Sequence, residues 1–229
     1  MAAGEGTRLR PLTERWAKPV LPIDGRPVIA TLLRELAAAG CARATVVTGH
    51  LAEQVERVVG DGRAFGLRVE LVRQPRPDGS ADAVARALEA GAALPCLVTA
   101  ADTVFSPGDV ARFAETFAET GADGALAVRR DPSPSPPHRY AVGIEDGRVT
   151  RLHDDDPSNV LAAAPLWGLG EAPARHLRID TPPYELAASY QQAIDDGAVV
   201  AAVEIGPTRD LTFPLDLVQE NFPYLNAYE

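Results

Sequence analysis

The stretch Cys96-Leu97-Val98-Thr99-Ala100-Ala101-Asp102 decides the expected fold, because it is a nearly continuous apolar run that ends in an acid. Such a run, without the alternation of a strand that has one solvated face, is typical of a strand buried on both faces of a parallel sheet. We expect a central parallel strand over residues 96–101. Open α/β sheets bind ligands at the carboxyl ends of their strands, so Asp102 is the first candidate functional residue.

Helix and strand patterns alternate before this run. Apolar residues at helical spacing follow Pro27, and Gly40 provides a stop signal. Between Gly40 and the apolar run, the segments show either helical spacing or the alternation of a strand. The expected elements are a helix over 27–39, a strand over 44–48, a helix over 52–59, a strand around 67–71 and a helix over 80–90.

After residue 107 the pattern changes, but no clean linker appears. A proline-rich loop covers 131–137, and Glu145-Asp146-Gly147 between two strand-like runs predicts a β-hairpin. The second half therefore extends the same sheet, and one domain is expected. The remaining expected elements are helices over 109–119, 183–196 and 214–221, and strands over 124–129, 140–144, 148–152, 163–169 and 198–205.

Composition excludes several classes of protein. The 229 residues carry a formal net charge of −10, which argues against a nucleic-acid surface. No apolar run is long enough for a membrane span, and no secretory segment follows Met1, so a cytoplasmic protein is expected, with no membrane partner. Cys41 and Cys96 lack metal-ligand spacing and are expected to be small hydrophobic residues without chemistry.

A glycine-rich segment at the start of the chain has the properties of a phosphate-binding loop. Gly4, Gly6 and Thr7 precede Arg8, so backbone N–H groups can converge on an anion beside a fixed positive charge. Ten residues later stands Lys18, the sole lysine among 22 Lys and Arg residues, which hints that this position needs an ammonium group.

Residues Ala2–Leu12 with Lys18-Pro19, the segment Gln74–Ala81, and Asp102 together resemble the sugar-phosphate nucleotidyltransferases. This family includes glucose-1-phosphate thymidylyl- and uridylyltransferases, and the N-terminal domain of archaeal-type sugar-1-phosphate nucleotidyltransferases is similar. The resemblance implies a Rossmann-like mixed, mostly parallel sheet flanked by helices, of the GT-A-like kind. Weaker similarities are found at Tyr140–Val142, Pro157–Asn159, Tyr184–Leu186 and Asp210–Asn221.

The resemblance implies a set of nucleotide and metal roles. Asp102 and Asp210 would hold Mg²⁺, with Asp216 as the nearby alternative to Asp210. Arg8 and Lys18 would neutralise phosphate oxygens, and with Asp102 they form the expected catalytic set. The expected nucleotide-binding residues are Ala3, Gly4, Gly6, Thr7 and Arg8 for the triphosphate, and Gln74 and Gly79 for a pyrimidine base.

The sugar half departs from the family pattern. Tyr140, Ala141 and Asp154 are the expected sugar-binding residues, but Asp154 begins a triple-aspartate run where the family has Glu-Lys-Pro, and a solvated acidic loop is an equal alternative. Because the family's lysine meets the sugar phosphate, either an arginine replaces it here or the acceptor binds differently.

The resemblance implies one nucleotidyltransferase domain over residues 1–229, with a nucleotide-binding half over about 1–130 and a sugar-binding half over about 131–229. Only Met1–Ala3 precede the glycine-rich loop, so the first strand is expected to be truncated. The expected reaction joins a nucleoside triphosphate, with UTP or dTTP favoured, to a sugar 1-phosphate and releases pyrophosphate. The alternatives are a guanylyl- or cytidylyltransferase acting on another phosphorylated acceptor, and a non-catalytic nucleotide-binding regulatory domain. The sequence leaves open whether the chain forms a homo-oligomer.

Overall fold

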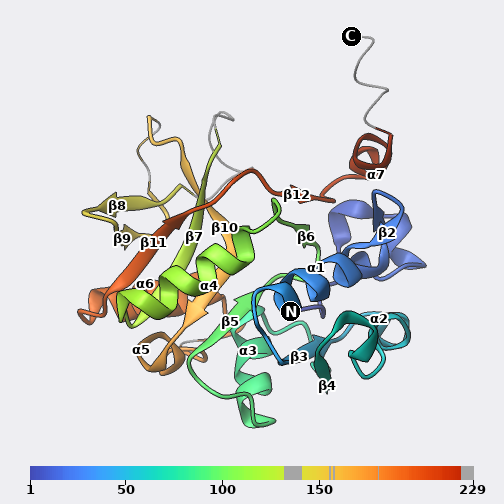
Figure 1. Cartoon of the computed structure of the whole chain (residues 1–229), viewed down its shortest axis with the longest axis horizontal. Helices are drawn as coiled ribbons and strands as arrows, with labels where there is room; N and C mark the ends of the chain where they lie inside the picture. The colour runs from blue at the N-terminus through green and yellow to red at the C-terminus, as the bar shows by residue number, and fades with distance from the viewer. Residues whose placement is uncertain (132–140, 155, 157, 180, 223–229) are drawn as a thin grey trace. The chain divides into compact units, whose positions relative to one another are not determined.

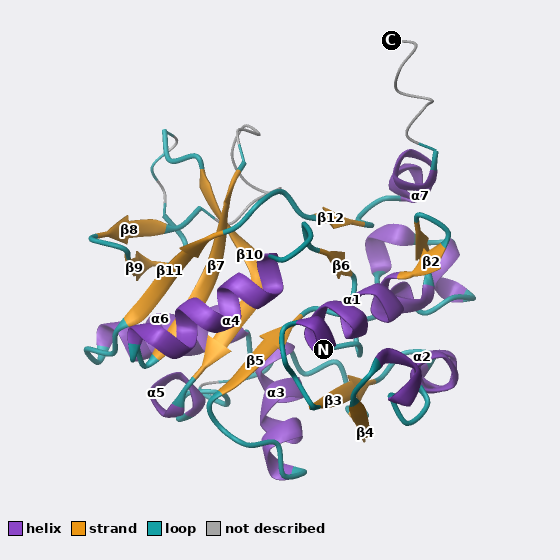
Figure 2. Ribbon diagram, in the orientation of Figure 1, coloured by secondary structure: helices purple, strands orange, loops and turns teal. Residues whose placement is uncertain are grey.

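The computed structural model describes residues 1–131, 141–154, 156, 158–179 and 181–222, which fall into two compact units (Figure 1). The first unit contains Met1–Pro77, Ala100–Phe105 and Thr208–Glu229, and the second contains Asp78–Thr99 and Ser106–Pro207. Both units combine helices with strands (Figure 2), so the expected α/β class is confirmed. The description of the chain as a single domain stays a prediction.

The first unit is built around helix α1 and a parallel pair of strands. Apolar side chains of α1 at helical spacing are buried, as the sequence pattern predicts. The elements of this unit are η1 (Thr7–Leu9), η2 (Leu12–Glu14), η3 (Lys18–Val20), β1 (Pro22–Ile23), β2 (Arg26–Pro27), α1 (Val28–Ala38), β3 (Arg43–Thr48), α2 (Ala52–Val59), η4 (Arg63–Phe65), β4 (Arg68–Arg73), β6 (Thr103–Val104), β12 (Arg209–Asp210) and α7 (Pro214–Asn221).

The first residues of the chain lie beside strand β3. β3 and β4 pair in parallel register, and Ala2 forms an isolated parallel bridge with Thr48. The Ala2 N–H donates to the Val47 carbonyl at 2.8 Å, and the Met1 carbonyl accepts the Ala101 N–H, also at 2.8 Å. Met1–Ala3 thus supply the strand-like pairing that leads into the glycine-rich segment.

One apolar cluster joins distant parts of the first unit. Leu9 of the glycine-rich segment, Val28 of α1 and Leu211 after β12 are each 1% exposed and belong to this cluster, together with Leu21 and Ile23. Burial of such side chains is the main favourable term in folding. Because Arg8 adjoins Leu9 and Asp210 adjoins Leu211, the cluster fixes the chain on both sides of the expected site.

The second unit contains a six-stranded sheet in the order β5-β10-β7-β11-β9-β8. β7 and β11 are parallel neighbours, whereas the other neighbouring pairs are antiparallel, so β5, β7, β11 and β8 point one way and β10 and β9 the other. The elements of this unit are α3 (Ser80–Glu89), β5 (Cys96–Thr99), α4 (Asp109–Thr120), β7 (Gly124–Arg130), β8 (Gly143–Glu145), β9 (Arg148–Arg151), β10 (Leu161–Leu169), α5 (Glu171–Ala174), α6 (Leu186–Asp195) and β11 (Val200–Glu204).

The expectation for strand β5 needs correction. It was expected to be a parallel strand over 96–101, but it ends at Thr99 and its paired neighbour in the sheet is the antiparallel strand β10. An apolar run shows that a strand is buried on both faces but does not show the direction of its neighbour. The neighbour comes from a segment more than 60 residues later, so local pattern could not reveal it.

Helices α4 and α6 cover opposite faces of this sheet. A Cβ added at Gly168 of β10 would lie 2.6 Å from the Phe117 ring of α4, and one added at Gly124 of β7 would lie 3.0 Å from the Tyr190 ring of α6. Gly168 pairs with Ala125, one residue after Gly124, so the two glycines face opposite sides. Both helices approach the sheet closely because a glycine leaves room for an aromatic ring.

The predicted β8–β9 hairpin is confirmed. Asp146 and Gly147 have φ values of 48° and 75°, and this pair of positive values is that of a type I′ turn. A second hairpin, β1–β2, has the same turn at Asp24-Gly25, with φ values of 52° and 71°. Its strands are only two residues long, so no alternating pattern marked it in the sequence.

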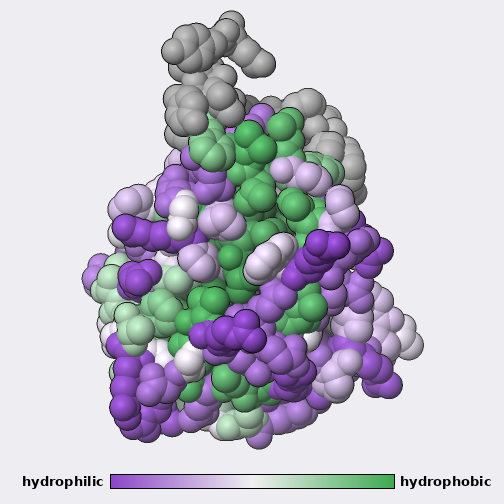
Figure 3. All heavy atoms as spheres, turned by 90° about the vertical axis from the view of Figure 1, so that its right-hand side faces the viewer, coloured by the Kyte–Doolittle hydropathy of each residue, from purple (hydrophilic) through white to green (hydrophobic). Residues whose placement is uncertain are grey.

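The surface has a concentration of apolar side chains near the end of the described chain. Phe213, Leu215 and Val218, in and beside α7, remain more than 40% exposed. Figure 3 shows a face on which hydrophobic residues gather between hydrophilic ones.

Among the described helices, none has the length and apolar character needed to span a membrane. Cys41 and Cys96 are free and half-buried, and burial raises the pKa of Cys96 to about 11, which agrees with an inert role.

Candidate active site

The glycine-rich segment forms a tightly held turn in the first unit. Gly6 has a φ of 61°, and a Cβ there would lie 2.9 Å from Thr13 Cγ2 and 3.4 Å from Lys18 Cβ. Thr13 is a buried residue, 1% exposed, and its hydroxyl donates a hydrogen bond to the Gly6 carbonyl at 2.8 Å. Only glycine fits this conformation and this contact without strain. The Gly6 backbone is thereby held in place.

The two cations expected at phosphate oxygens differ in their surroundings. Arg8 is exposed, and within the described part of the chain its guanidinium has no carboxylate or hydrogen-bond partner, whereas Arg10 pairs with Glu5 at 3.3 Å. Lys18 Nζ forms an ion pair with Asp102 Oδ2, and these side chains are 17% and 26% exposed. The structure therefore brings the sole lysine to the candidate metal-binding aspartate.

Strands β6 and β12 bring the backbones of the two candidate magnesium ligands into neighbouring register. β12 pairs antiparallel with β6, and Asp210 stands opposite Thr103, the residue after Asp102. The Thr103 hydroxyl approaches Asp102 Oδ1 at 3.5 Å, and the Thr212 hydroxyl donates to Asp210 Oδ1 at 3.1 Å. More than 100 residues of sequence separate the two aspartates, and this short ladder brings their backbones close together.

Asp216, the alternative ligand, has another role. Its Oδ2 accepts the backbone N–H groups of Thr212 and Phe213, each at 2.7 Å, at the N-terminus of α7. A carboxylate in this position satisfies helix N–H groups that would otherwise lack partners. Asp216 caps α7, and Asp210 is the aspartate whose register adjoins Asp102.

The donor set agrees with what Mg²⁺ prefers. Asp102 and Asp210 supply carboxylate oxygens, and two protein ligands leave coordination positions for phosphate oxygens and water. Across the described residues, no group of three or more His, Cys, Asp or Glu side chains converges in a way that could hold a metal. A metal here would therefore depend on both this pair and its substrate.

Gln74, expected to read the base, is buried. It follows β4, is 6% exposed, and its N–H donates to the Thr48 carbonyl at 2.8 Å. Its backbone is therefore fixed to the end of β3. Gln74 therefore does not lie on an exposed loop.

Two residues that sequence reasoning did not select hold the segment between the loop and Lys18. Gln54 of α2 accepts the Ala17 N–H at 2.8 Å and donates to the Arg15 carbonyl at 2.7 Å. His50 Nε2 lies 2.7 Å from the Thr13 carbonyl, so this nitrogen carries a proton. Scattered polar residues at the start of a helix carry no sequence signal for these contacts.

We predict that Gln54→Met weakens triphosphate binding about tenfold. The change leaves the Ala17 N–H and the exposed Arg15 carbonyl without their partner next to Lys18, and an unpaired buried group such as the Ala17 N–H costs about 1–3 kcal/mol. Calorimetric titration with UTP and dTTP measures the effect. Gln54→Glu is the control. It keeps an acceptor for the Ala17 N–H, so its triphosphate affinity should lie between those of the wild type and Gln54→Met. Wild-type affinity in Gln54→Met would exclude a role for this clamp.

Gly79, the second residue expected at the base, lies in the second unit, whereas Gln74 lies in the first. Gly79 has a φ of 106°, and a Cβ there would lie 2.2 Å from the Tyr184 carbonyl oxygen. That carbonyl accepts the Ala81 N–H, and the Tyr184 N–H donates to the Asp78 carbonyl, both at 2.8 Å. The weakly matching Tyr184–Leu186 segment therefore holds residues Asp78–Ala81 in shape.

Of the expected sugar-binding residues, Tyr140 lies outside the described residues. Ala141 forms an antiparallel bridge with Ala162, and its carbonyl accepts the Asp154 N–H at 3.0 Å. Asp154 Oδ2 accepts a bond from Asn159 Nδ2 at 2.6 Å, and its Oδ1 accepts the Asp156 N–H at 3.2 Å. Asp154 thus organises its own loop.

A cavity of about 610 Å³ in the second unit is lined by residues of β8, β9 and this loop. Arg151, Asp154 and Asn159 are among the polar residues that line it. The Arg151 side chain has no carboxylate partner among the described residues. Arg151 lines this cavity together with the acidic residues Glu145, Asp154 and Asp156, and it is a candidate for the positive charge that the sequence lacks at the family's lysine position.

Comparison with known proteins gives consistent results. Residues 1–154 match the family model described as nucleotidyl transferase. The chain is 29% identical over 249 residues to a glucose-1-phosphate thymidylyltransferase of Streptomyces antibioticus, an alignment that covers 100% of this chain and 66% of the relative. It is 34% identical over 165 residues to a mannose-1-phosphate guanylyltransferase of Mycobacterium tuberculosis, covering 71% and 46%.

Among solved structures, the fold resembles that of the inositol-1-phosphate CTP transferase from T. maritima, with a TM-score of 0.80 and 18% identity over 94% of this chain and 88% of that chain. The chain spans about two-thirds of the Streptomyces antibioticus relative and less of the mycobacterial one. Since the family model covers well over half of the chain, and the loop, lysine and aspartates described above lie together in one unit, the chain belongs to the nucleotidyl transferase family.

Proposed function

We propose that this protein is a sugar-1-phosphate nucleotidyltransferase that converts a nucleoside triphosphate and a sugar 1-phosphate into a nucleotide sugar and pyrophosphate. The observation that carries the proposal is the pairing of β12 with β6, which places the backbone of Asp210 opposite Thr103, the residue that follows Asp102, the partner of Lys18. Cations and metal-binding carboxylates in one place suit a reaction between two phosphorylated substrates.

In this reaction an oxygen of the sugar phosphate attacks the α-phosphorus of the triphosphate. A new P–O bond forms, the bond from the α-phosphorus to the bridging oxygen breaks, and pyrophosphate leaves with that electron pair. No side-chain nucleophile is required. The barrier is lowered by positioning and by positive charge where negative charge accumulates.

The residues of the first unit divide this work. The fixed backbone around Gly4, Gly6 and Thr7, with Ala3 before it, binds the triphosphate, and unpaired Arg8 neutralises its oxygens. Lys18 holds its ammonium beside Asp102, where it would neutralise phosphate oxygens of the bound triphosphate. Mg²⁺ held by Asp102 and Asp210 would supply further positive charge to the phosphates.

For the base, Gln74 and Gly79 support UTP or dTTP as the substrate. Both are held by backbone hydrogen bonds, which keeps them pre-organised. The mycobacterial relative is named a guanylyltransferase, so a purine triphosphate is the second candidate. Because such substrates are made inside cells, a cytoplasmic location accompanies the proposal.

Product analysis tests the proposal. We expect ³¹P spectra of a mixture of enzyme, Mg²⁺, triphosphate and sugar 1-phosphate to show the two resonances of a diphosphate ester, with UTP or dTTP giving more product than GTP or CTP. A preference for GTP would select the guanylyltransferase reading. Nucleotide binding without a diphosphate ester from any pair would select the non-catalytic regulatory domain.

For the acceptor, we infer that Arg151 replaces the missing lysine as the partner of the sugar phosphate. Arg151→Met is expected to raise KM for the sugar 1-phosphate about tenfold, because a charge-assisted bond to phosphate is lost, while KM for the triphosphate changes less than twofold. Steady-state kinetics with each substrate varied in turn give both constants.

Arg148→Met, on the same strand but outside the cavity lining, is the matched control and should leave both constants unchanged. If Arg151→Met leaves KM for the sugar 1-phosphate at the wild-type value, the acceptor binds without this arginine.

A further inference from the structure

Asp210 lies in a strand too short to hold its own position. β12 and β6 are two residues each and, among the described strands, pair only with one another. A ladder of this length is marginal without support from its surroundings. The location of a candidate metal ligand therefore depends on what anchors the residues on either side of it.

One side is anchored by packing. Leu211 is 1% exposed and belongs to the cluster that contains Leu9 and Val28. Beyond it, the Asp216 carboxylate binds the N–H groups of Thr212 and Phe213. The chain that follows Asp210 is thus fixed to the core and to the start of α7.

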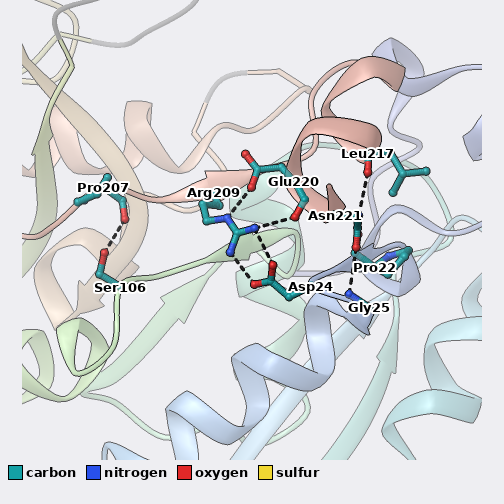
Figure 4. A network of polar contacts seen from close by, with 9 residues as sticks. All are labelled: Pro22, Asp24, Gly25, Ser106, Pro207, Arg209, Leu217, Glu220 and Asn221. Carbon is teal, nitrogen blue, oxygen red and sulfur yellow. Dashed lines mark hydrogen bonds and ion pairs between the residues drawn. The ribbon is translucent and has the colours of Figure 1, made fainter. Parts of the chain in front are cut away.

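The other side is anchored by Arg209, which binds two carboxylates (Figure 4). Its Nη1 and Nη2 donate to the two oxygens of Asp24 at 2.6 and 3.0 Å, a bidentate pair with the tip of the β1–β2 hairpin. Its Nε donates to Glu220 Oε2 at 2.5 Å, and Nη2 also donates to the Glu220 carbonyl at 2.8 Å. Fork-shaped contacts of this kind fix geometry as well as charge.

The same hairpin and helix are tied together a second time. Asn221 Nδ2 donates to the Pro22 carbonyl at 2.7 Å, and the Gly25 N–H donates to Asn221 Oδ1 at 3.0 Å. These bonds hold α7 against the hairpin independently of Arg209. Loss of the arginine should therefore loosen β12 without releasing the helix.

The Arg209 contacts are suited to a local rather than a global role. The Arg209 and Asp24 side chains are 37% and 61% exposed, and exposed ion pairs add little to overall stability. Their geometric effect is concentrated on the neighbour of Asp210. We propose that Arg209, through Asp24 and Glu220, is a positioning residue that holds Asp210 for divalent-metal binding. This inference rests on the proposed function, in which Asp210 is a metal ligand.

Mn²⁺ alone, titrated into the full chain and followed by the EPR signal of the free ion, tests the inference without turnover. We expect Arg209→Met to weaken Mn²⁺ binding about tenfold or more, as loss of an outer-shell partner does. Asp24→Asn should weaken Mn²⁺ binding less than Arg209→Met does. The double variant should bind Mn²⁺ no more weakly than Arg209→Met, because the contact that Asp24→Asn removes is already lost in Arg209→Met. Arg43→Met, which removes the exposed 3.4 Å pair with Glu70, is the control and should bind like wild type.

Amide hydrogen exchange gives a second measurement on the same proteins. Protection at residues 209–211 should fall in Arg209→Met, while protection across α1 stays unchanged. If Arg209→Met fails to fold, Asp24→Asn at the exposed turn carries the test. Wild-type Mn²⁺ affinity in the folded Arg209 or Asp24 variants would overturn the inference, as would absence of Mn²⁺ binding to the wild-type chain.

The outcome separates this inference from the proposed function. If Mn²⁺ binding depends on Arg209 and Asp210 but no triphosphate and sugar pair reacts, positioning of Asp210 stands and the proposed reaction falls. If the wild type turns over but Asp210→Asn binds Mn²⁺ normally, the positioning inference falls while the reaction stands.

Discussion

Asp102→Asn is expected to lower kcat by about 10³-fold while the protein stays folded. The change removes a charged metal ligand and the partner of Lys18 but keeps the size of the side chain. Metal and charge stabilisation of a transition state is worth several kcal/mol, and about 4 kcal/mol corresponds to 10³ in rate. Rates measured across a Mg²⁺ series should show a higher Mg²⁺ requirement together with a lower maximum.

The fold should survive this change because Asp102 is partly exposed, and a partly exposed ion pair contributes about 1 kcal/mol or less to stability. Urea unfolding of both proteins provides the check. Asp216→Asn is a useful comparison: it weakens the cap of α7, about 1 kcal/mol, and should affect stability more than the chemical step. An Asp102→Asn enzyme with wild-type kcat at moderate Mg²⁺ would remove Asp102 from the catalytic set.

Lys18→Met is expected to lower kcat/KM by about 10²–10³-fold. Its ammonium lies beside Asp102, and loss of a single donor that stabilises transition-state charge costs that much in other enzymes. Because the aliphatic stem contacts the Gly6 turn, methionine keeps the packing and isolates the charge.

Lys18→Arg separates charge from geometry. A planar guanidinium keeps the charge but cannot occupy the same confined position beside Gly6, so we expect less than tenfold recovery over Lys18→Met. Single-turnover rates at saturating triphosphate measure the chemical step. Full recovery with arginine would show that the sole lysine reflects composition rather than chemistry.

The sequence allowed most helices and the first functional segment to be predicted, because these features are local. α1, α2 and α7 begin and end within about one residue of the expected positions, since apolar spacing and flanking proline or glycine set their limits. The Asp146-Gly147 turn was predictable for the same reason. The Gly4–Arg8 segment was selected as a candidate phosphate-binding loop from residue types alone, and that role stays a prediction.

Features built from distant contacts could not be predicted this way. The antiparallel partner of β5, the interleaving of segments from both ends in the first unit, and the β6–β12 ladder all join residues far apart in the sequence. A carboxylate at Asp210 could be expected from resemblance, but the Arg209–Asp24 contact that supports it could not, because neither residue carries a local signal.

The roles of individual polar residues show the same division. Asp216 and Asp210 are equivalent acids by type, and only hydrogen-bond partners identify one as a helix cap and the other as the neighbour of the β6 strand. Gln54 and His50 were not selected because a polar residue at the start of a helix is usually solvated. Arg151 could be suspected only as one of many arginines until its place in the cavity was known.

The most direct test of the central claim is pyrophosphate release, measured with Mg²⁺, UTP or dTTP, and glucose 1-phosphate among a panel of sugar 1-phosphates. We predict release that requires both substrates, depends on Mg²⁺, and falls about 10³-fold in Asp102→Asn. Tight triphosphate binding with no pyrophosphate release from any pair of substrates would contradict the account and identify a nucleotide-binding domain without transferase activity.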